Sequence, residues 1–420
     1  MTHIDYTKNL LNIKDQNVNL YENFLEIKKI KGVDTKIIHA YLTYEVHTCP
    51  ICKQNNSVIK WNWKRNCKVI STKMANYNTI ILLDKQRFKC KHCNHTFIAT
   101  TPLVDKFCNI SNDTKKAIKL DLMDKISEKD IAKRNNVSHN SVNRIIDEMS
   151  RKKVLPGVLP SIIHIDEFKA TKDTKGKMAF HIVNGISGKT FDILESRKSN
   201  YIFNYFMKFP RKQRLNVKFI VVDMFEPYYT LLKKIFPKAT IITDKFHVIA
   251  LASNALKCTR VQIMKKDKKY YNKLKHFWKL IQKYEDDLDN KNKKYSIYFG
   301  KEVTDYEIVT YIINTNKELK ATYRIYQGIL RSIKNKDIEL FGRIISSKQN
   351  NISEYMMTTL KTLNKFSYHI INSFKYNFNN GIIEGINNLI KCIKRIAFGY
   401  RSFYHFKARI MLISGIKIYN

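Results

Sequence analysis

Glycine, proline and long apolar runs are all scarce in this 420-residue sequence. Twelve glycines and seven prolines leave little material for flexible linkers, so we expect short connections between elements. No stretch approaches the roughly 20 apolar residues that a membrane-spanning helix needs. Polar residues rather than a signal-type apolar core follow Met1. The sequence therefore argues against collagen-like, proline-rich and membrane-spanning classes, and we expect a cytoplasmic protein.

Several catalytic signatures are also missing. The sequence has no phosphate-binding loop of the G-x-x-x-x-G-K-[ST] type, no G-x-G-x-x-G and no nucleophile elbow with a Ser/His/Asp set. A mechanism with a covalent enzyme intermediate is therefore not expected.

Acidic residues are few compared with basic ones. The chain holds 36 Asp and Glu against 76 Lys and Arg, which gives a formal net charge of +40 spread from end to end. Such an excess is typical of proteins that bind a polyanion. The Lys, Asn and Ile bias of an AT-rich genome produces the same excess, so charge alone does not establish DNA binding. The length favours two or three domains.

Four of the eight cysteines form two C-x-x-C pairs, CPIC at Cys49 and Cys52 and CKHC at Cys90 and Cys93. Each pair can turn two thiolates toward one ion, and two pairs complete a tetrahedral zinc site. We predict structural rather than catalytic zinc, because no open-site His/Glu set accompanies the cysteines. Possible substitute ligands are Cys67, His92 and His95.

Residues 115–150 contain ISEKDIAKRNNVSHNSVNRIIDEM, with apolar residues at helical spacing on both sides of a turn at 135–138. The pattern predicts a helix-turn-helix whose second helix is capped by Ser138. An ordinary pair of packed helices is the alternative. The residues expected to face a DNA groove are His139, Asn140, Ser141, Asn143 and Arg144.

Strand patterns begin after VLPGVLP (154–160), which is typical of a linker. SIIHIDEF, GKMAFHIVNGI and KTFDILES predict a three-stranded meander, and two further strands, VKFIVVDM and KATIITDKFH, alternate with helices. Three strands followed by alternating helix and strand is the order of a ribonuclease-H-like core.

Two aspartates end strands that this order makes neighbours: Asp166 ends the first and Asp223 the fourth. Two carboxylates at one sheet edge repel each other unless a cation lies between them. Mg²⁺ or Mn²⁺ suits carboxylate oxygens. Two such ions, about 3.5–4 Å apart, would assist an in-line phosphoryl displacement.

A third acid is available in NNGIIEGINNLIKCIKRIAFGYRSF, where apolar spacing places Glu384 in the first turn of a helix. We expect this helix to pack on the sheet and to bring Glu384 to Asp166 and Asp223. The basic residues expected to contact DNA phosphates are Lys391, Lys394, Arg395 and Arg401.

IDEFK, VVDMFEPY, TDKFHV and the block NNGIIEGINNLIKCIKRIAFGYRSFYHFKARI resemble the sequences of DDE transposases of the ISL3 insertion-sequence family. The resemblance covers nearly the whole chain from the cysteines onward. It implies that Asp166, Asp223 and Glu384 form the catalytic triad, and that the cysteines and helix-turn-helix recognise the terminal inverted repeats of a bacterial mobile element. Asn184 stands where members often have an acid, but this position is outside the triad.

Helical spacing dominates between Asp244 and the Glu384 block and predicts an all-α insertion, in which Tyr271, Trp278 and Tyr323 serve core packing rather than base stacking. Asp244 and His247 are rival candidates for metal or DNA binding, and Asp244 could replace Asp223 as a ligand. We expect the neighbouring acids Glu167 and Glu226 to support the site or to lie on the surface.

The expected fold class is α/β: a ribonuclease-H-like mixed-sheet core with an all-α insertion, preceded by a zinc-binding ribbon and a helix-turn-helix. The expected parts are a helical segment (1–45), a zinc-binding domain (46–105), the helix-turn-helix (110–153), the core (160–254 and 376–420) and the insertion (255–375).

Together these features predict a transposase that cleaves double-stranded DNA at the ends of an element and joins them to a target, working as a homodimer or larger assembly near the nucleoid. The alternatives are a zinc and helix-turn-helix DNA-binding regulator without catalysis, and a structure-selective nuclease that cleaves but never joins. DNA binding by such a transposase should weaken strongly with salt, because many phosphates are neutralised.

Overall fold

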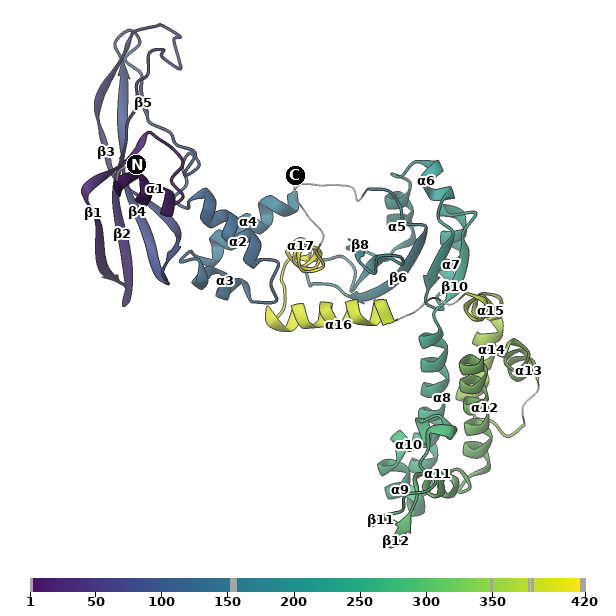
Figure 1. The fold of residues 1–420 in the computed structure, drawn as a ribbon. Coiled ribbons are helices and arrows are strands. Elements are labelled where there is room, and N and C mark those ends of the chain that lie inside the picture. The colour runs from purple at the N-terminus through teal and green to yellow at the C-terminus, as the bar shows by residue number, and fades with distance from the viewer. Residues whose placement is uncertain (1–2, 152–156, 348–349, 377, 379–380, 416–420) are drawn as a thin grey trace. The chain divides into compact units, whose positions relative to one another are not determined.

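The chain folds into two compact units in the computed structural model (Figure 1). The first unit comprises Met1–Val154, Thr171–Asp173 and Ile390–Asn420, and the second comprises Leu155–Ala170 and Thr174–Leu389. The structure describes residues 3–151, 157–347, 350–376, 378 and 381–415. Residues 154–156 of the predicted linker lie outside the described residues. No helix among the described residues is long and apolar enough to cross a membrane.

The first unit begins with helix α1 (His3–Leu10) and a five-stranded sheet in the order β1-β2-β4-β3, with β5 paired to β4. Its core is formed by apolar residues that alternate along the strands, such as Ile38, Ala40 and Leu42. The strands are β1 (Val18–Ile30), β2 (Val33–Leu42), β3 (Val58–Met74), β4 (Tyr77–Cys90) and β5 (Thr96–Ile98).

The predicted helical segment over residues 1–45 is wrong beyond α1, because residues 18–42 form the hairpin β1–β2. Lys31 and Gly32 form its two-residue turn with φ of 51° and 79°. Two positive φ values give the turn the twist that antiparallel strands need. Strands β3 and β4 of the predicted zinc-binding domain therefore lie in one sheet with β1 and β2, which the sequence analysis assigned to a separate N-terminal segment.

Helices α2 (Asn112–Asp121), α3 (Glu128–Arg134) and α4 (His139–Arg151) follow the sheet, and the turn 135–138 lies where the sequence places it. Ser138 accepts a hydrogen bond from the backbone nitrogen of Ser141 at 3.2 Å, as expected of a cap. These helices bury one shared cluster with α17 (Phe403–Ile413), through Ala408 and Leu412. The placement of α17 differs from the expectation that residues 376–420 pack with the core sheet.

The second unit is built on a five-stranded sheet in the order β10-β9-β6-β7-β8. Neighbours β6, β7 and β8 pair antiparallel as a meander, whereas β9 and β10 run parallel to β6. The first and fourth strands are therefore neighbours, as predicted. The strands are β6 (Ile162–Lys169), β7 (Met178–Asn184), β8 (Thr190–Leu194), β9 (Phe219–Val222) and β10 (Thr240–Thr243), and the connecting helices are α5 (Ser199–Phe206), α6 (Arg211–Leu215) and α7 (Glu226–Ile235).

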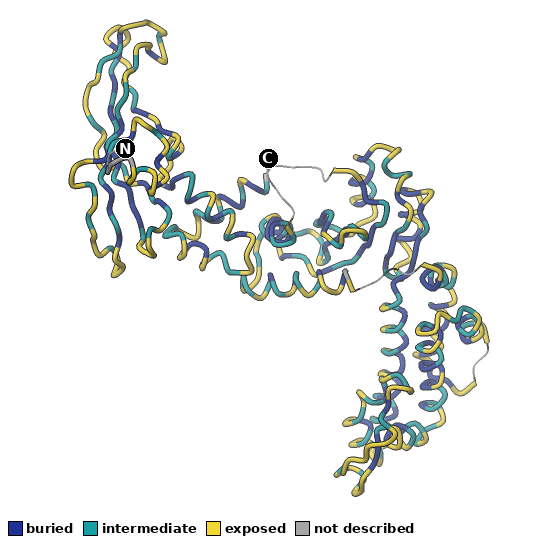
Figure 2. The backbone as a smooth tube through the Cα atoms, viewed as in Figure 1, coloured by how far each residue is buried: buried dark blue, intermediate teal, exposed yellow. Residues whose placement is uncertain are grey.

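The sheet is apolar on its strands, and Figure 2 shows most of its backbone as buried. Ile202 and Phe206 of α5 and Leu232 of α7 belong to the core cluster that includes Ile163 and Ile220 of the sheet. Parallel strands joined through helices end at one edge, so the residues that follow β9 and β10 share an edge with the end of β6.

A mainly helical insertion follows β10, and it starts earlier than predicted because α8 begins at Lys245. Tyr323 and Tyr326 of α12 are buried, which confirms core packing there. The same prediction is wrong for Tyr271 and Trp278, which are 37% and 39% exposed. The short hairpin of β11 (Lys294–Ser296) and β12 (Lys301–Val303) shows that the insertion is not all-α. Its helices are α8 (Lys245–Lys266), α9 (Tyr271–His276), α10 (Trp278–Gln282), α11 (Asp305–Ile313), α12 (Lys317–Asn335), α13 (Ile338–Ser346), α14 (Glu354–Lys365) and α15 (Ser367–Lys375), and α16 (Gly381–Ile396) comes after them.

Candidate functional site

Three aspartates follow the same register at one edge of the second unit's sheet. His164 of β6 pairs with Val221 of β9. Two residues further along the chain stand Asp166, still on β6, and Asp223, directly after β9. Asp244 follows directly after β10, whose last residue pairs with the last residue of β9. The register thus brings a carboxylate from each of three neighbouring strands to one edge.

His247, in the first turn of α8, joins two of these aspartates. Its Nδ1 lies 2.8 Å from Asp223 Oδ1 and 3.2 Å from Asp244 Oδ2. Asp244 also caps α8, because its Oδ1 accepts from the backbone nitrogen of Phe246 at 2.7 Å. One potential ligand atom from each of Asp223, Asp244 and His247 lies within 4.8 Å of the others.

The electrostatics of this edge favour a cation. Burial raises the pKa of Asp223, and the charges of Asp166 and Asp244 raise it further, although the hydrogen bond to His247 opposes them. Burial alone would lower the pKa of His247, but its bonds to both carboxylates outweigh burial and raise the pKa to about 10. The protonated imidazole thus neutralises part of a concentrated negative charge.

Helix α16 reaches the same edge through Asn387, whose Nδ2 donates a hydrogen bond to Asp166 Oδ2. The second oxygen of Asp166, Oδ1, accepts from the backbone nitrogen of Glu167 at 2.6 Å. Glu384 lies one turn before Asn387, on the same side of the helix, and is exposed. The cluster of ligand atoms within 4.8 Å contains neither Asp166 nor Glu384.

Asn387 was not singled out by the sequence analysis. Its Oδ1 is buried and has no hydrogen-bond partner among the residues that the structure describes. A buried, unpaired amide oxygen beside a carboxylate cluster fits a hard divalent cation, since Mg²⁺ accepts amide and carboxylate oxygens alike. An Asn three residues after the predicted acid, on the same helical face, is the signal that could have identified it.

Glu167 and Glu226 are engaged elsewhere. Glu167 accepts a hydrogen bond from the Tyr228 hydroxyl and pairs with Arg197 at 2.8 Å, so it anchors α7 to β6. Glu226 pairs with Lys365. Neither contact involves the aspartates at the sheet edge.

The four predicted cysteine ligands meet in the first unit. Cys49 Sγ and Cys93 Sγ are 3.7 Å apart, as are those of Cys52 and Cys90, and all four lie within 4.8 Å. Tetrahedral zinc with Zn–S bonds of about 2.3 Å requires sulfur separations of roughly 3.8 Å, so the set fits zinc. A hydrogen bond with the Ser57 hydroxyl lowers the pKa of Cys90 to about 6, which favours the ligating thiolate. The group does not include the suggested substitutes Cys67, His92 and His95.

The residues predicted to face DNA on α4 divide into two groups. His139, Asn140 and Arg144 are exposed, whereas Ser141 and Asn143 are half-buried. The Ser141 hydroxyl lies 2.9 Å from that of Ser138, so it takes part in the cap.

The basic residues of α16 and the following turn also differ in exposure. Lys391, Arg395 and Arg401 are exposed, whereas Lys394 is half-buried with its Nζ 4.9 Å from the ring centroid of Phe406. Their exposure favours Lys391, Arg395 and Arg401 as the phosphate contacts.

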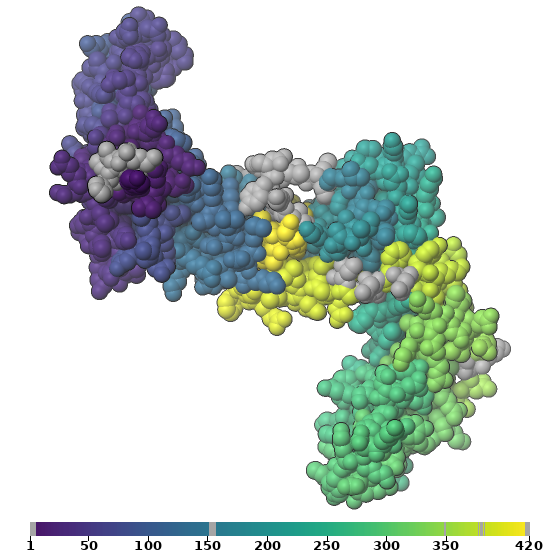
Figure 3. Space-filling model, in the orientation of Figure 1, coloured from purple at the N-terminus to yellow at the C-terminus, as the bar shows by residue number. Residues whose placement is uncertain are grey.

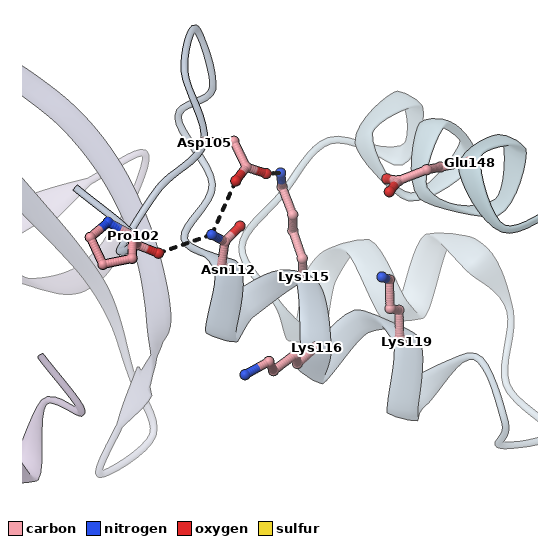
Figure 4. A pocket seen from close by; sticks show the side chains of 7 residues that line it. All are labelled: Pro102, Asp105, Asn112, Lys115, Lys116, Lys119 and Glu148. Atoms are coloured by element: carbon pink, nitrogen blue, oxygen red, sulfur yellow. Dashed lines mark hydrogen bonds and ion pairs between the residues drawn. The ribbon is translucent and has the colours of Figure 1, made fainter. Parts of the chain in front are cut away.

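A further basic surface lies on α2, beside a hollow of about 400 Å³ (Figure 4). Lys115 pairs there with Asp105, and Asn112 donates to the same carboxylate at 3.1 Å. The side chains of Lys116 and Lys119 extend from the next turns of the helix. The hollow is open and mostly polar, and we assign it no ligand.

Comparison with curated proteins gives two partial matches. The first, named "ATP-dependent protease", from Lactococcus lactis subsp. lactis, is 37% identical over 129 residues, which is 30% of this chain and 41% of the relative. The second, "Transposase for insertion sequence element IS1001" from Bordetella parapertussis, is 24% identical over 253 residues, which is 59% of each chain. The alignments thus span about half the length of these relatives.

The family comparison matches most of the second unit and continues past Leu389 into the C-terminal part of the first unit. The sequence model of the ISL3-type DDE transposases, described as "Transposase", matches residues 163–410, which is more than half of the chain. The matched region contains the strands β6 to β10, the insertion and α16. This protein therefore belongs to the ISL3 family of DDE transposases.

Proposed function

We propose that the protein binds the terminal inverted repeats of a mobile element, cleaves the DNA at the element ends and joins them to a target in a metal-dependent reaction. The observation that carries the proposal is the register that sets Asp166 and Asp223 side by side, with Asn387 of α16 bonded to Asp166. Membership of a transposase family supports the same reaction class.

The core of this proposal is a ribonuclease-H-like sheet. Three antiparallel strands followed by two parallel ones, with the first strand at the centre, support that assignment. In this arrangement the parallel strands end at one edge, and a phosphodiester could approach the carboxylates there without crossing the helices that cover the sheet.

Asp166, Asp223 and Glu384 are the proposed catalytic acids. Divalent ions held by these carboxylates would activate the attacking oxygen and stabilise the leaving oxygen. Asn387 orients Asp166 and offers its free Oδ1 to the same site. Glu384 is exposed one turn from Asn387, and in this proposal the binding of metal and DNA turns its side chain toward Asp166 and Asp223.

Asp244 and His247 have a supporting role in this proposal. His247 bridges Asp223 and Asp244, and it keeps the edge from carrying three uncompensated charges. Asp244 is also the cap of α8, so its carboxylate helps to fix where the insertion starts. Asp244 remains the alternative to Asp223 as a metal ligand. Substitution of Asp244 distinguishes this ligand role from its role as the cap of α8.

DNA recognition is assigned to the first unit. The pair α3–α4 is the proposed helix-turn-helix, with His139, Asn140 and Arg144 facing the groove. The four-cysteine centre holds zinc that fixes the ends of β3 and β4 in place. Because one active site must meet two element ends, we propose a dimer or larger assembly on DNA.

The name of the Lactococcus relative does not transfer to this chain. ATP-dependent activity would need a phosphate-binding loop between a strand and a helix. The nearest sequence, Gly188-Lys189-Thr190, begins in the turn between the antiparallel strands β7 and β8 and ends at the first residue of β8. No strand-to-helix loop is present at that position, so we do not propose proteolysis.

The test uses a labelled duplex carrying inverted repeats taken from the DNA that flanks the gene, together with a supercoiled target plasmid and Mg²⁺. We expect end cleavage and strand-transfer products with the wild-type protein. Asp166→Asn, Asp223→Asn and Glu384→Gln should abolish both while leaving end binding intact. Glu339→Gln, on the exposed surface of α13, is the matched control and should retain both. Asn387→Ala should reduce the rate about 10–100-fold as the loss of a group that orients a ligand.

Each alternative function has its own result. Binding without products from any variant favours the regulator, and nicking that depends on the acids but never yields joined DNA favours the nuclease. Replacing Asp166 by cysteine tests metal contact directly, since a thiolate accepts Mn²⁺ better than Mg²⁺. Activity of Asp166→Cys that returns in Mn²⁺ but not in Mg²⁺ supports a role of Asp166 as a metal ligand. If Asp244→Asn is as inactive as Asp223→Asn, Asp244 also belongs to the metal site.

A further inference from the structure

Residues 265–315 of the insertion form a lysine-rich segment that the proposed reaction does not use. We call it the insertion tip; it contains the end of α8, helices α9 to α11 and the hairpin β11–β12 (Figure 3). Residues 265–315 hold twelve lysines and eight acidic residues. All of these residues are described by the structure, and Lys283, paired with Asp305, is the only one of the twelve lysines in an ion pair within 4.0 Å.

Large apolar side chains are exposed on the same segment. Tyr295 and Ile297 of the hairpin are 68% and 86% exposed, and Trp278 of α10 is 39% exposed. Figure 2 colours many residues around β11 and β12 as exposed. Core packing accounts for Leu274 and Ile281, which are buried, but it does not account for these. Aromatic rings among lysines without an acidic partner are typical of surfaces that bind nucleic acid bases.

A cavity of about 660 Å³ lies in the tip, and its walls combine aromatic rings with lysines. Lys273 Nζ stands 4.7 Å from the ring centroid of Phe299 and 4.6 Å from that of Tyr311. Tyr306 and Tyr311 of α11 are both partly exposed. Ligand cavities commonly measure about 300–1,000 Å³, so the space suits a nucleobase with its sugar. The lining residues on which the argument rests are Lys273, Phe299, Lys301, Tyr306, Glu307 and Tyr311.

The one acid in the wall does not cancel the basic charge at the cavity mouth. Glu307 is the third residue of a capping box, in which its carboxylate accepts from the backbone nitrogen of Thr304 at 2.9 Å. That bond directs its charge to the start of α11. Lys273 and Lys301 remain as the charged groups available to an anion on the ligand.

We propose that the insertion tip binds unpaired nucleotides of DNA, with a base against the rings of the cavity and flanking phosphates on Lys273 and Lys301. An aromatic cavity beside lysines matches a nucleotide, because stacking needs a ring face and the phosphate needs a cation. Paired bases inside a duplex present no free face, so lysines alone would serve duplex DNA. The inference rests on the proposed function in one respect: it takes DNA rather than RNA as the polymer that the protein meets.

The cavity residues provide matched substitutions. Tyr306→Ala removes a ring of the wall, and Tyr355→Ala on α14 is its control, because both tyrosines are 45% exposed. Lys273→Ala removes a cation, and Lys361→Ala, exposed on α14, is its control. Tyr306→Phe keeps the ring and should keep the binding.

The test measures the binding of the full chain to fluorescein-labelled 12-nucleotide oligothymidine and to a blunt duplex of equal length. Loss of one stacking ring weakens binding about tenfold. We expect Tyr306→Ala to weaken oligothymidine binding by that factor and duplex binding by less than twofold. Lys273→Ala should weaken both, and the two controls neither. Each variant should unfold at the same temperature as the wild-type protein, which verifies that the substitution leaves the insertion folded.

A crosslinking readout identifies the site directly. Oligothymidine carrying 5-iododeoxyuridine crosslinks to aromatic side chains on irradiation, and mass spectrometry should find the adduct on peptides containing Tyr306 or Tyr311. Adducts confined to other parts of the chain would overturn the proposal, as would equal effects of Tyr306→Ala and Tyr355→Ala. Asp223→Asn should bind oligothymidine like the wild type. Failure of strand transfer therefore bears on the catalytic proposal, and failure of base binding bears on this one.

Discussion

Arg409 of α17 provides the sharpest test of how the first unit is held together. It is 2% exposed, and its guanidinium donates to three backbone oxygens that follow α2: those of Leu122, of Asp124 at 3.2 Å and of Ile126 at 2.7 Å. The last carbonyls of a helix lack partners within the helix. A side chain from the far end of the sequence thus supplies the donors that this turn needs.

The substitution Arg409→Met keeps a long side chain and removes every donor. Leu122 is buried and Ile126 half-buried, so their carbonyl oxygens lose a partner that water replaces poorly, whereas Asp124 is exposed and can bind water. An unsatisfied buried acceptor costs about 1–3 kcal/mol. Two such acceptors destabilise the helical cluster. Removal of the buried guanidinium charge offsets part of this cost, so the expected net loss of stability is about 2–4 kcal/mol.

Hydrogen exchange of the full chain, followed by mass spectrometry, measures this loss locally. The opening free energy of amides in α3 and α4 should fall by about 2–4 kcal/mol in Arg409→Met, because both helices share their core with α17. Arg343→Met on α13 is the matched control, since Arg343 is exposed in the other unit. A change in α3 and α4 no larger than in this control would refute the reasoning. Arg409→Lys, which keeps a single cation with fewer directed donors, should lie between the two.

Two further predictions concern the metal centre and pH. Cys90→Ser should lower the zinc content of the purified protein and destabilise the first unit, whereas Cys67→Ser should retain one zinc per chain; elemental analysis and thermal unfolding check both. Burial lowers the pKa of His181 to about 3, so the unfolded chain binds its proton first, and stability present above about pH 6.5 is lost as the pH falls toward 3. Between pH 7 and pH 5 this group should cost about 2 kcal/mol in urea unfolding, and His181→Gln should remove that part of the decrease.

The elements that the sequence predicts correctly are those whose signal is local. Two C-x-x-C pairs meet because each knuckle needs only a few residues, and the turn 135–138 is marked by the Ser that caps the next helix. Asp166 and Asp223 are neighbours because β6 pairs with β9. The sequence indicates this strand order through the number and spacing of its apolar runs, without knowledge of which residues pair. Period and spacing are sufficient for such features.

The features that the sequence analysis missed depend on partners far along the chain or on weak turn signals. The hairpin β1–β2 turns at Lys31-Gly32, and lysine gives little indication of a positive φ. The amphipathic pattern of α17 shows that one face is buried, but not which helices cover it. Its contacts with α2 to α4 join residues that are more than 250 positions apart.

Asn387 shows why a search for charged residues alone describes an active site incompletely. The hydrogen bond that joins α16 to the sheet edge among the described residues comes from an amide bonded to Asp166, not from the acid one turn earlier. A carboxylate that must hold a cation at a fixed place needs a neighbour that fixes its rotamer, and a neutral amide does this without adding another charge to the cluster. If Glu384 turns inward only when metal and DNA are bound, Asn387 is the contact that already holds its helix in register with Asp166. Loss of Asn387 should therefore slow the reaction without abolishing it, whereas loss of Glu384 should abolish it.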